Sequence, residues 1–118
     1  MSLVMDSSKI EKFIDRQRVS FICSVDSEGF PNVRAMLKPR KRISLREFYF
    51  STNTSSAKVQ QYRHNSKASI YFYHKGLIKY TGVMHYKEGK TDPNYCVLKF
   101  IAESGRYYLD LRTKDFKV

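Results

Sequence analysis

Short runs of β-branched and aromatic residues, each closed by turn-forming residues, fill most of this chain and limit what it can fold into. The clearest pattern is a hairpin, in which VSFICSV at 19–25 and NVRAMLK at 32–38 flank the turn residues DSEGFP. Further runs of the same kind are REFYFST at 46–52, ASIYFYHK at 68–75, LIKYTGVMHY at 77–86, YCVLKFIA at 95–102, GRYYLDLRT at 105–113 and DFKV at 115–118. We expect 95–102 and 105–113 to form an antiparallel pair around Glu103–Gly105, and 115–118 to be a short edge strand.

Two segments between these runs have helical character. Ile10, Phe13 and Ile14 have the spacing of one helical face, which predicts a helix over about 8–18. A second, short helix is predicted over 55–64. Many successive strands with only two helices indicate an antiparallel barrel and not alternating βαβ units. We therefore predict a mainly β fold with short helices, in one domain spanning residues 1–118.

The composition argues against several kinds of site. Cys23 and Cys96 each lie inside an apolar run, so we interpret them as core residues and not as a disulfide framework or a metal site. The three histidines match no short metal-ligand spacing, so no metal is expected. No apolar run approaches the roughly 20 residues of a membrane span, and the N-terminus lacks a secretory pattern. We expect a cytoplasmic protein that does not associate with membranes.

The charge of the chain favours an anionic partner. Lys and Arg number 22 against 11 Asp and Glu, which gives a net charge of +11. Such a surface suits a nucleic acid, an acidic protein or a phosphorylated small molecule. The cations are spread along the chain except in KPRKR at 38–42. A run of this kind is most often a solvated loop, and nucleic-acid contact is its less common use.

One polar stretch, STNTSSAKVQQYRHN at 51–65, has the parts of a phosphate-binding site. A helix that begins at Ser55 or Ser56 presents unpaired backbone N–H groups and the positive end of its dipole. Lys58 adds a full charge within the first turn, and nearby hydroxyl groups add donors. The plainer alternative is an N-cap with surplus serines. The P-loop and GxGxxG patterns are absent, so neither of those nucleotide sites is expected.

A cation on another strand extends this site. Alternation in strand 32–38 directs Arg34, Met36 and Lys38 to one face. This face is either a solvent-exposed side or an outer face that lies along a flat, negatively charged ligand. Successive strands usually neighbour each other, and strand 32–38 beside strand 47–52 would place Arg34 next to the phosphate-binding stretch.

These segments together resemble a known family. The pattern G-x-P-x-x-R-x-M at 29–36, the aromatic strand ending in STNTSSAK and the segment QQYRHN at 60–65 are similar to the pyridoxamine 5′-phosphate oxidase-like flavoproteins. DPNYCVLKFIAESGRYY at 92–108 is similar to the general stress protein 26 branch in particular. The resemblance covers nearly the whole chain. It implies an antiparallel split β-barrel, the FMN-binding split barrel, that works as a homodimer with FMN at the subunit interface.

The resemblance also implies a set of cofactor-binding residues. Ser56 and Lys58, helped by Ser55, would hold the FMN phosphate, and Arg34 would contact the ribityl phosphate or the polar edge of the flavin. The positions that would line the ring or bond to the ribityl chain are Met36, the backbone near Leu37, Ser51, Thr52 and Asn53. The partner subunit would cover the ring, with Tyr71 and Tyr73 as candidates. Lys38 matches the family motif less well because its spacing after Arg34 differs.

The sequence departs from the family in two places. The chain has no tryptophan and lacks the Arg-x-His element with which true pyridoxamine phosphate oxidases grip their substrate phosphate, so we do not expect that activity. The segment after Tyr86 runs almost directly into Lys87–Gly89 and is shorter than in relatives of the stress-protein branch. No obvious catalytic acid, base or nucleophile lies near the phosphate-binding stretch, so the catalytic residues are unassigned.

We therefore expect an FMN-binding flavoprotein, an oxidoreductase acting on an unidentified small molecule, or a flavin-binding protein without turnover. Some relatives use deazaflavin or heme instead, and these are lesser options. The alternative of another class is a basic β-barrel that binds nucleic acid, for which the charge, KPRKR and many tyrosines argue. That alternative requires basic and aromatic residues on one exposed face. It is disfavoured because the aromatic residues lie mostly in strands, where they first serve the core and dimer contacts.

Overall fold

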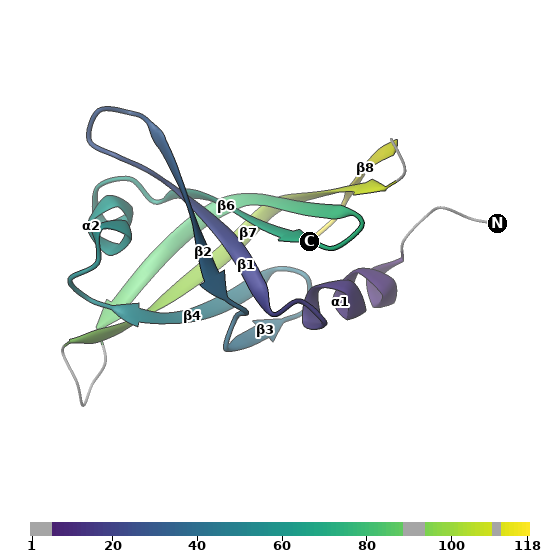
Figure 1. Ribbon diagram of the computed structural model, residues 1–118, viewed down its shortest axis with the longest axis horizontal. Helices are drawn as coiled ribbons and strands as arrows, with labels where there is room; N and C mark the ends of the chain where they lie inside the picture. The colour runs from purple at the N-terminus through teal and green to yellow at the C-terminus, as the bar shows by residue number, and fades with distance from the viewer. Residues whose placement is uncertain (1–5, 89–93, 110–111) are drawn as a thin grey trace.

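The computed structural model describes residues 6–88, 94–109 and 112–118, which form one antiparallel sheet curled into a barrel with two short helices (Figure 1). In chain order the elements are α1 (Ser7–Asp15), β1 (Val19–Val25), β2 (Pro31–Leu37), β3 (Lys41–Ile43), β4 (Glu47–Asn53), α2 (Ala57–His64), β5 (Lys67–Tyr73), β6 (Leu77–Glu88), β7 (Tyr95–Leu109) and β8 (Arg112–Phe116). The predicted class, a mainly β antiparallel barrel, is confirmed. The passage from Tyr86 into Lys87–Gly89, which was predicted to be shortened, continues β6 as far as Glu88, and its remainder lies outside the described residues.

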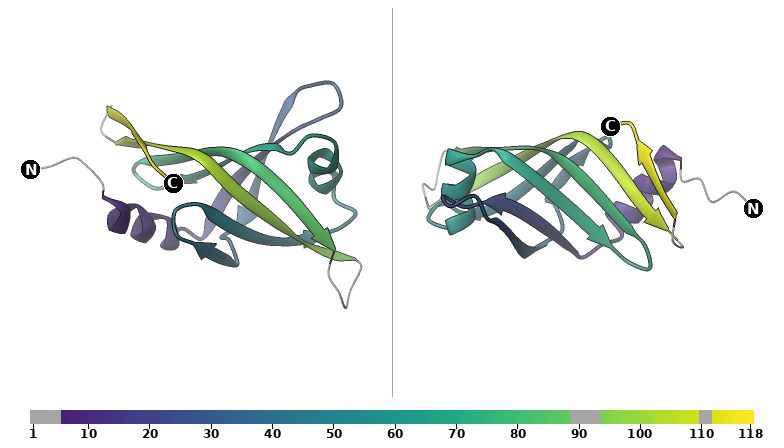
Figure 2. Two further views of the ribbon diagram at one scale, coloured as in Figure 1. Left: turned by 180° about the vertical axis from the view of Figure 1, so that it is seen from behind. Right: turned by 90° about the horizontal axis from the view of Figure 1, so that it is seen from above.

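The strand order leaves the barrel split. The sheet runs β2-β1-β5-β6-β7-β4-β3, and β8 pairs with the far end of β7. β2 and β4 therefore lie toward opposite ends of the sheet, and the prediction that they are neighbours is wrong. The reason is that β4 pairs with β7, which sets Phe48 opposite Phe100 and Phe50 opposite Leu98 in the buried layer. Figure 2 shows how the twist of the long strands brings the two ends of the sheet back toward each other.

An aromatic cluster fills the barrel. The Phe48 ring centroid lies 5.0 Å from that of Tyr80, 5.7 Å from that of Phe72 and 6.2 Å from that of Phe100. α1 covers one end of this core with two isoleucines, Ile10 and Ile14, which are 1% and 2% exposed. The predicted apolar face of this helix is thus confirmed. Cys96 is buried, as predicted, whereas Cys23 is only half-buried on the outer face of β1.

The predicted pair of strands around Glu103–Gly105 is wrong, because β7 continues through this segment as one strand of 15 residues. Ser104 pairs with Thr81 and Gly105 with Tyr80, so β6 provides a partner along the whole length. Gly105 is not a turn residue, and its lack of a side chain makes room for the Phe116 ring. A Cβ there would lie 2.4 Å from the Phe116 ring, which β8 lays over the strand. β8 also begins at Arg112, before the predicted 115–118.

Smaller differences concern α1 and the basic run. α1 ends at Asp15 and not near residue 18, because Gln17 folds back and donates from Nε2 to the Phe13 carbonyl at 2.7 Å. Within KPRKR, residues 41 and 42 belong to β3, which pairs with β4, so the run is only partly a loop. Neither described helix is long and apolar enough to cross a membrane.

Candidate functional site

Helix α2 is held against β1 by two buried contacts. The Tyr62 hydroxyl donates to the Cys23 carbonyl at 2.8 Å, and the Ser24 hydroxyl donates to the side-chain oxygen of Gln61. α2 thereby packs against β1 and β6. Since β2 is the hydrogen-bonded neighbour of β1, Arg34 of β2 comes close enough to act electrostatically on Lys58 of α2. α2 therefore links the end of β4, to which Ser56 bonds, with β1 and β6.

Ser56 is the N-cap residue of α2, but its side chain does not cap the helix. A serine in this position ordinarily accepts a hydrogen bond from a backbone N–H of the first turn. Here the side chain makes no such bond, and Oγ is buried without a described partner. The backbone N–H of Ser56 donates to the Asn53 carbonyl at 3.1 Å, which ties the cap to the end of β4. The hydroxyl and the first N–H groups of the helix therefore remain free to donate to a ligand.

Arg34 reaches this position from β2. Its face of the strand, shared with Met36, is half-buried and turned inward, while the alternate residues Val33 and Leu37 are 65% and 81% exposed. The prediction that the Arg34 face is an outer face is thus wrong, because the apolar residues and not the cation occupy the outside. The Nε atom of Arg34 is buried and makes no hydrogen bond to the described residues.

Lys58 lies in the first turn of α2 and is only 9% exposed. Burial, and secondly the nearby positive charge of Arg34, lower the pKa of Lys58. Among the residues that the structure describes, neither cation forms an ion pair with a carboxylate. Two cations therefore face each other at a buried position where an anion would relieve the repulsion between them.

The unsatisfied donors identify the chemistry that would complete this site. Within the described chain, three buried side-chain polar atoms lack a hydrogen-bond partner, namely Arg34 Nε, Ser56 Oγ and Tyr80 Oη. Leaving such a group unpaired costs about 1–3 kcal/mol. Two of the three belong to the residues that surround Lys58. We refer to Arg34, Ser56 and Lys58 as the phosphate cradle, because a phosphate group offers the several acceptor oxygens that these donors require.

The structure brings only part of the predicted set to this cradle. Thr52 is half-buried on the inward face of β4, and Met36 packs against the core beside Arg34. Ser51 and Asn53 alternate with Thr52 and are exposed, and Ser55 is exposed in the turn. The Leu37 side chain also points outward, although its carbonyl accepts from the Ser20 hydroxyl at 3.2 Å. The remaining candidates, Lys38, Tyr71 and Tyr73, lie outside the cradle on the loop after β2 and on β5.

Sequence reasoning missed the residues that hold α2 in place. Val59 and Tyr62 are both buried and three residues apart, which is a helical signal that could have marked the packed face. Their contact with β1 could not be read from the sequence, because Cys23 lies 39 residues before Tyr62. Sequence-local patterns therefore predicted the candidate anion-binding residues but not the residues that position them.

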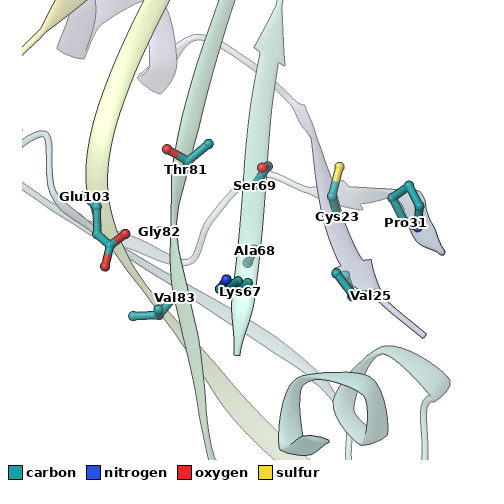
Figure 3. Close-up of a pocket in the computed structure, with 11 residues that line it drawn as sticks. Cys23, Val25, Pro31, Lys67, Ala68, Ser69, Thr81, Gly82, Val83 and Glu103 are labelled. Carbon is teal, nitrogen blue, oxygen red and sulfur yellow. The ribbon is translucent and has the colours of Figure 1, made fainter. Parts of the chain in front are cut away.

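A separate hollow of about 360 Å³ lies on the outer face of the sheet (Figure 3). Cys23, Val25 and Pro31 border it on one side, and Lys67 and Glu103 lie among its more distant lining. Burial raises the pKa of the Cys23 thiol, so it is protonated at neutral pH and is not poised as a nucleophile. Elsewhere among the described residues, no group of His, Cys, Asp and Glu is arranged to hold a metal ion.

Comparison with known proteins relates this chain to others. A family model described as pyridoxamine 5′-phosphate oxidase matches residues 7–108. A Clostridium acetobutylicum protein related to general stress protein 26 has a similar structure, with a TM-score of 0.84, 24% identity and 97% of each chain covered. General stress protein 26 of Bacillus anthracis has a TM-score of 0.76 and 19% identity, with 93% of this chain and 98% of that chain covered.

An FMN-binding protein related to pyridoxamine 5′-phosphate oxidase, from Nostoc punctiforme, also has a similar structure. Its TM-score is 0.72 at 16% identity, and the match covers 91% of this chain and 86% of that one. No curated protein sequence matches the chain. These likenesses confirm the split-barrel fold.

Proposed function

Because this chain belongs to the pyridoxamine 5′-phosphate oxidase family, whose model matches residues 7–108, we propose that it binds FMN and acts as a flavin-dependent oxidoreductase on a small molecule. The observation that carries the proposal is the phosphate cradle, in which Arg34 Nε and Ser56 Oγ are buried without partners beside a buried lysine. The FMN-binding relative from Nostoc punctiforme supports the choice of cofactor.

Each residue of the cradle has a distinct task in this proposal. Lys58 and Arg34 neutralise the phosphate charge, and Ser56 donates a hydrogen bond from the N-cap of α2. Met36 lies next in register on the same face as Arg34 and offers an apolar surface to a ring that continues along β2. Bound FMN would supply hydride and electron transfer, while this chain supplies position and electrostatics. The family's own pyridoxine phosphate chemistry is not proposed, since no tryptophan is present.

A comparison of two flavins tests the proposal. The protein is titrated with FMN and with riboflavin, which carries the same ring without the phosphate, and quenching of flavin fluorescence reports binding. We expect FMN to bind at least about 100-fold more tightly, because charge-assisted hydrogen bonds to a phosphate contribute about 1.5–3 kcal/mol each. Equal affinities, or no binding of either flavin, would refute the assignment of the cradle. Turnover is then sought by following reoxidation of the reduced, bound flavin with candidate acceptors.

The affinity for FMN should depend on pH in a defined direction. The pKa of Lys58 is lowered in the ligand-free protein, and a bound phosphate stabilises its charged form. Binding therefore takes up a proton when the pH lies above the ligand-free pKa, and affinity falls as the pH rises through that range. A titration between pH 7 and 10 should show this fall beginning below the pKa of an ordinary lysine. The Lys58→Met variant should not show the fall, and a fall of the same size there would exclude Lys58 as its source.

We also propose that the protein is a homodimer, with each cofactor at the interface between copies. β1 and β2 expose an apolar outer face, where Val19 lies opposite Leu37 and Cys23 lies opposite Val33. A monomer rarely presents such a face to water. β2 also directs Arg34 into the cradle, so a second copy seated on this face would cover the strand that holds the cofactor.

Leu37→Lys tests this interface. The side chain is 81% exposed, so the substitution should leave the fold of one subunit intact while placing a charge between two copies. We expect sedimentation analysis to show a shift from dimer to monomer, with at least tenfold weaker binding of FMN. Ile43→Lys is the matched control, because Ile43 is also exposed and lies on β3 at the opposite end of the sheet. A monomeric wild type, or an unchanged dimer in the Leu37 variant, would contradict the proposal.

A further inference from the structure

A basic groove lies beside α1, at the end of the barrel away from α2 and the phosphate cradle (Figure 1). It has a volume of about 400 Å³ and is formed by Lys9, Lys12, Phe13, Arg16, Gln17 and His74. We call these six residues the α1 groove. No carboxylate is among the described residues that line it, and the half-buried Phe13 provides its aromatic surface.

The three cations of the groove come from one side of α1. Lys9, Lys12 and Arg16 are spaced by three and four residues, so they form a single stripe along the helix, and all are exposed. His74 joins the stripe from the turn between β5 and β6, where its backbone N–H donates to the Gly76 carbonyl at 2.9 Å. Asp6 precedes the stripe at the N-cap of α1, and its carboxylate accepts from the Lys9 backbone N–H at 2.9 Å.

The acidic residues of α1 serve a different cation. Asp15 accepts two hydrogen bonds from Arg42, each 2.8 Å long, and Glu11 lies 3.4 Å from the same guanidinium. These carboxylates therefore hold β3 against α1 and leave the lysines of the groove without counter-ions on the helix. The remaining positive charge of α1 is concentrated on the groove side.

A second basic hollow, of about 260 Å³, lies on the Asp15 side of the same helix. Lys38, Arg40 and Lys41 line it together with Ile14 and the paired Asp15 and Arg42. An α-helix with its side chains is about 10–12 Å across. A single phosphate group is too small to touch both hollows, whereas a chain of phosphates can pass over the end of the helix from one to the other.

We propose that the α1 groove binds single-stranded nucleic acid, with Lys9, Lys12 and Arg16 contacting successive phosphates and Phe13 offering a surface on which a base stacks. This activity is separate from flavin binding and accounts for positive charge that the phosphate cradle does not use. Basic residues interleaved with an aromatic ring are the usual means of binding single strands without sequence preference. The groove thereby places three exposed cations beside a half-buried aromatic ring on one side of α1.

The arrangement favours a nucleic acid over an anionic membrane surface. A helix that lies in a membrane interface needs an exposed apolar face to insert between lipids. The isoleucines of α1, Ile10 and Ile14, are only 1% and 2% exposed and pack into the barrel. The exposed side of α1 is charged, so it can meet a phosphate backbone but has no apolar stripe for lipid.

Fluorescence anisotropy with labelled 20-nucleotide dT and U strands tests the proposal. We expect binding at 50 mM salt that weakens steeply as salt is added, because each contacted phosphate contributes about 0.7 to the slope of log affinity against log salt. The Lys12→Ala, Arg16→Ala double variant should bind at least about tenfold more weakly and lower that slope by about 1.4. The DNA and RNA arms show whether the 2′-hydroxyl contributes.

A charge-matched control separates the groove from the overall charge. Lys114 and Lys117 are exposed near the C-terminus, and replacing both by alanine removes the same two charges. We expect this control to change affinity by less than about threefold, and both double variants to keep wild-type FMN binding. Equal losses in the two variants, or no binding at low salt, would overturn the proposal. So would displacement of the strands by micromolar ATP, or by vesicles of phosphatidylserine, since these results would indicate a nucleotide or a lipid ligand.

Discussion

Replacing Lys58 by alanine is expected to weaken FMN binding by about 100-fold, so that the protein loses the cofactor on gel filtration. The substitution removes the buried charge that faces Arg34 and leaves the phosphate with one cation in place of two. A charge-assisted hydrogen bond in such a site contributes up to about 3 kcal/mol, and 1.4 kcal/mol corresponds to tenfold in affinity. Absorbance of the retained flavin, or a titration by fluorescence quenching, measures the loss.

The stability of the ligand-free variant separates this effect from unfolding. Burial lowers the pKa of Lys58, which means that its charged form is less favourable in the folded chain than in the unfolded one. This cost is fully present while the pH is below the folded-state pKa, declines as the pH rises from there, and is gone only above the unfolded-state pKa. Lys58→Met should therefore melt at the same temperature as the wild type or higher at neutral pH, while still failing to retain FMN. A much lower melting temperature would mean that unfolding explains the loss of FMN, and it would contradict the assignment of Lys58 as a buried charge that serves the ligand and not the fold.

The second large effect is expected from Gly82→Ala, which should lower the free energy of unfolding by about 3 kcal/mol or more. Gly82 lies on β6 at the bulge, and its neighbour β7 approaches its backbone closely. A Cβ at this position would lie 2.1 Å from the Ile101 carbonyl oxygen and 2.9 Å from the Ala102 Cα. Both are backbone atoms, so the contact cannot be relieved by rotating a side chain. Thermal melting should show a decrease of about 10 °C.

Gly29→Ala provides the contrast, because the two glycines are required for different reasons. Gly29 has a φ of +87° in the turn between β1 and β2, and nothing lies within 4 Å of a Cβ built there. Its replacement costs only the backbone strain of a left-handed conformation, about 1–2 kcal/mol. Gly82→Ala should therefore destabilise the protein more than Gly29→Ala. The reverse order would show that β7 can move away from β6 at the bulge.

The sequence predicted the parts of this fold more reliably than their arrangement. The alternation in 19–25 and 32–38 with DSEGFP between them predicted a hairpin, and β1 and β2 form it. The signals around Glu103–Gly105 were misleading, because a glycine that makes room for Phe116 has the same appearance as a turn glycine. The partner of β4 could not be predicted either, since it is chosen by the packing of Phe48 on Phe100, more than fifty residues apart.

The candidate site divides in the same way. Ser56 and Lys58 could be predicted because a helix N-terminus with hydroxyls and a lysine is a local pattern. Arg34 was correctly associated with them, but for a reason that the structure contradicts. It lies near Lys58 because α2 packs on β1 and not because β2 and β4 are neighbours. The exposure of a side chain depends on the whole fold and not on its sequence neighbours alone. The sequence therefore did not show that Thr52 faces inward while Ser51, Asn53 and Ser55 are exposed.

The strand order also has a consequence for the synthesis of the protein. β4 and α2 leave the ribosome long before β7, yet β7 is the strand on which β4 pairs. The pairing of β4 must therefore wait until Tyr95–Leu109 has been made, and long-range pairing of this kind is slow. Before then Phe48 can pack only on Phe72 of β5 and Tyr80 of β6. The residues of the phosphate cradle do not depend on this step, because Arg34 and Lys58 are brought together by the packing of α2 on β1, and both elements precede β7 in the chain. The late event in folding is therefore the closure of the barrel by β7, whereas the cradle can form before β4 has found its partner.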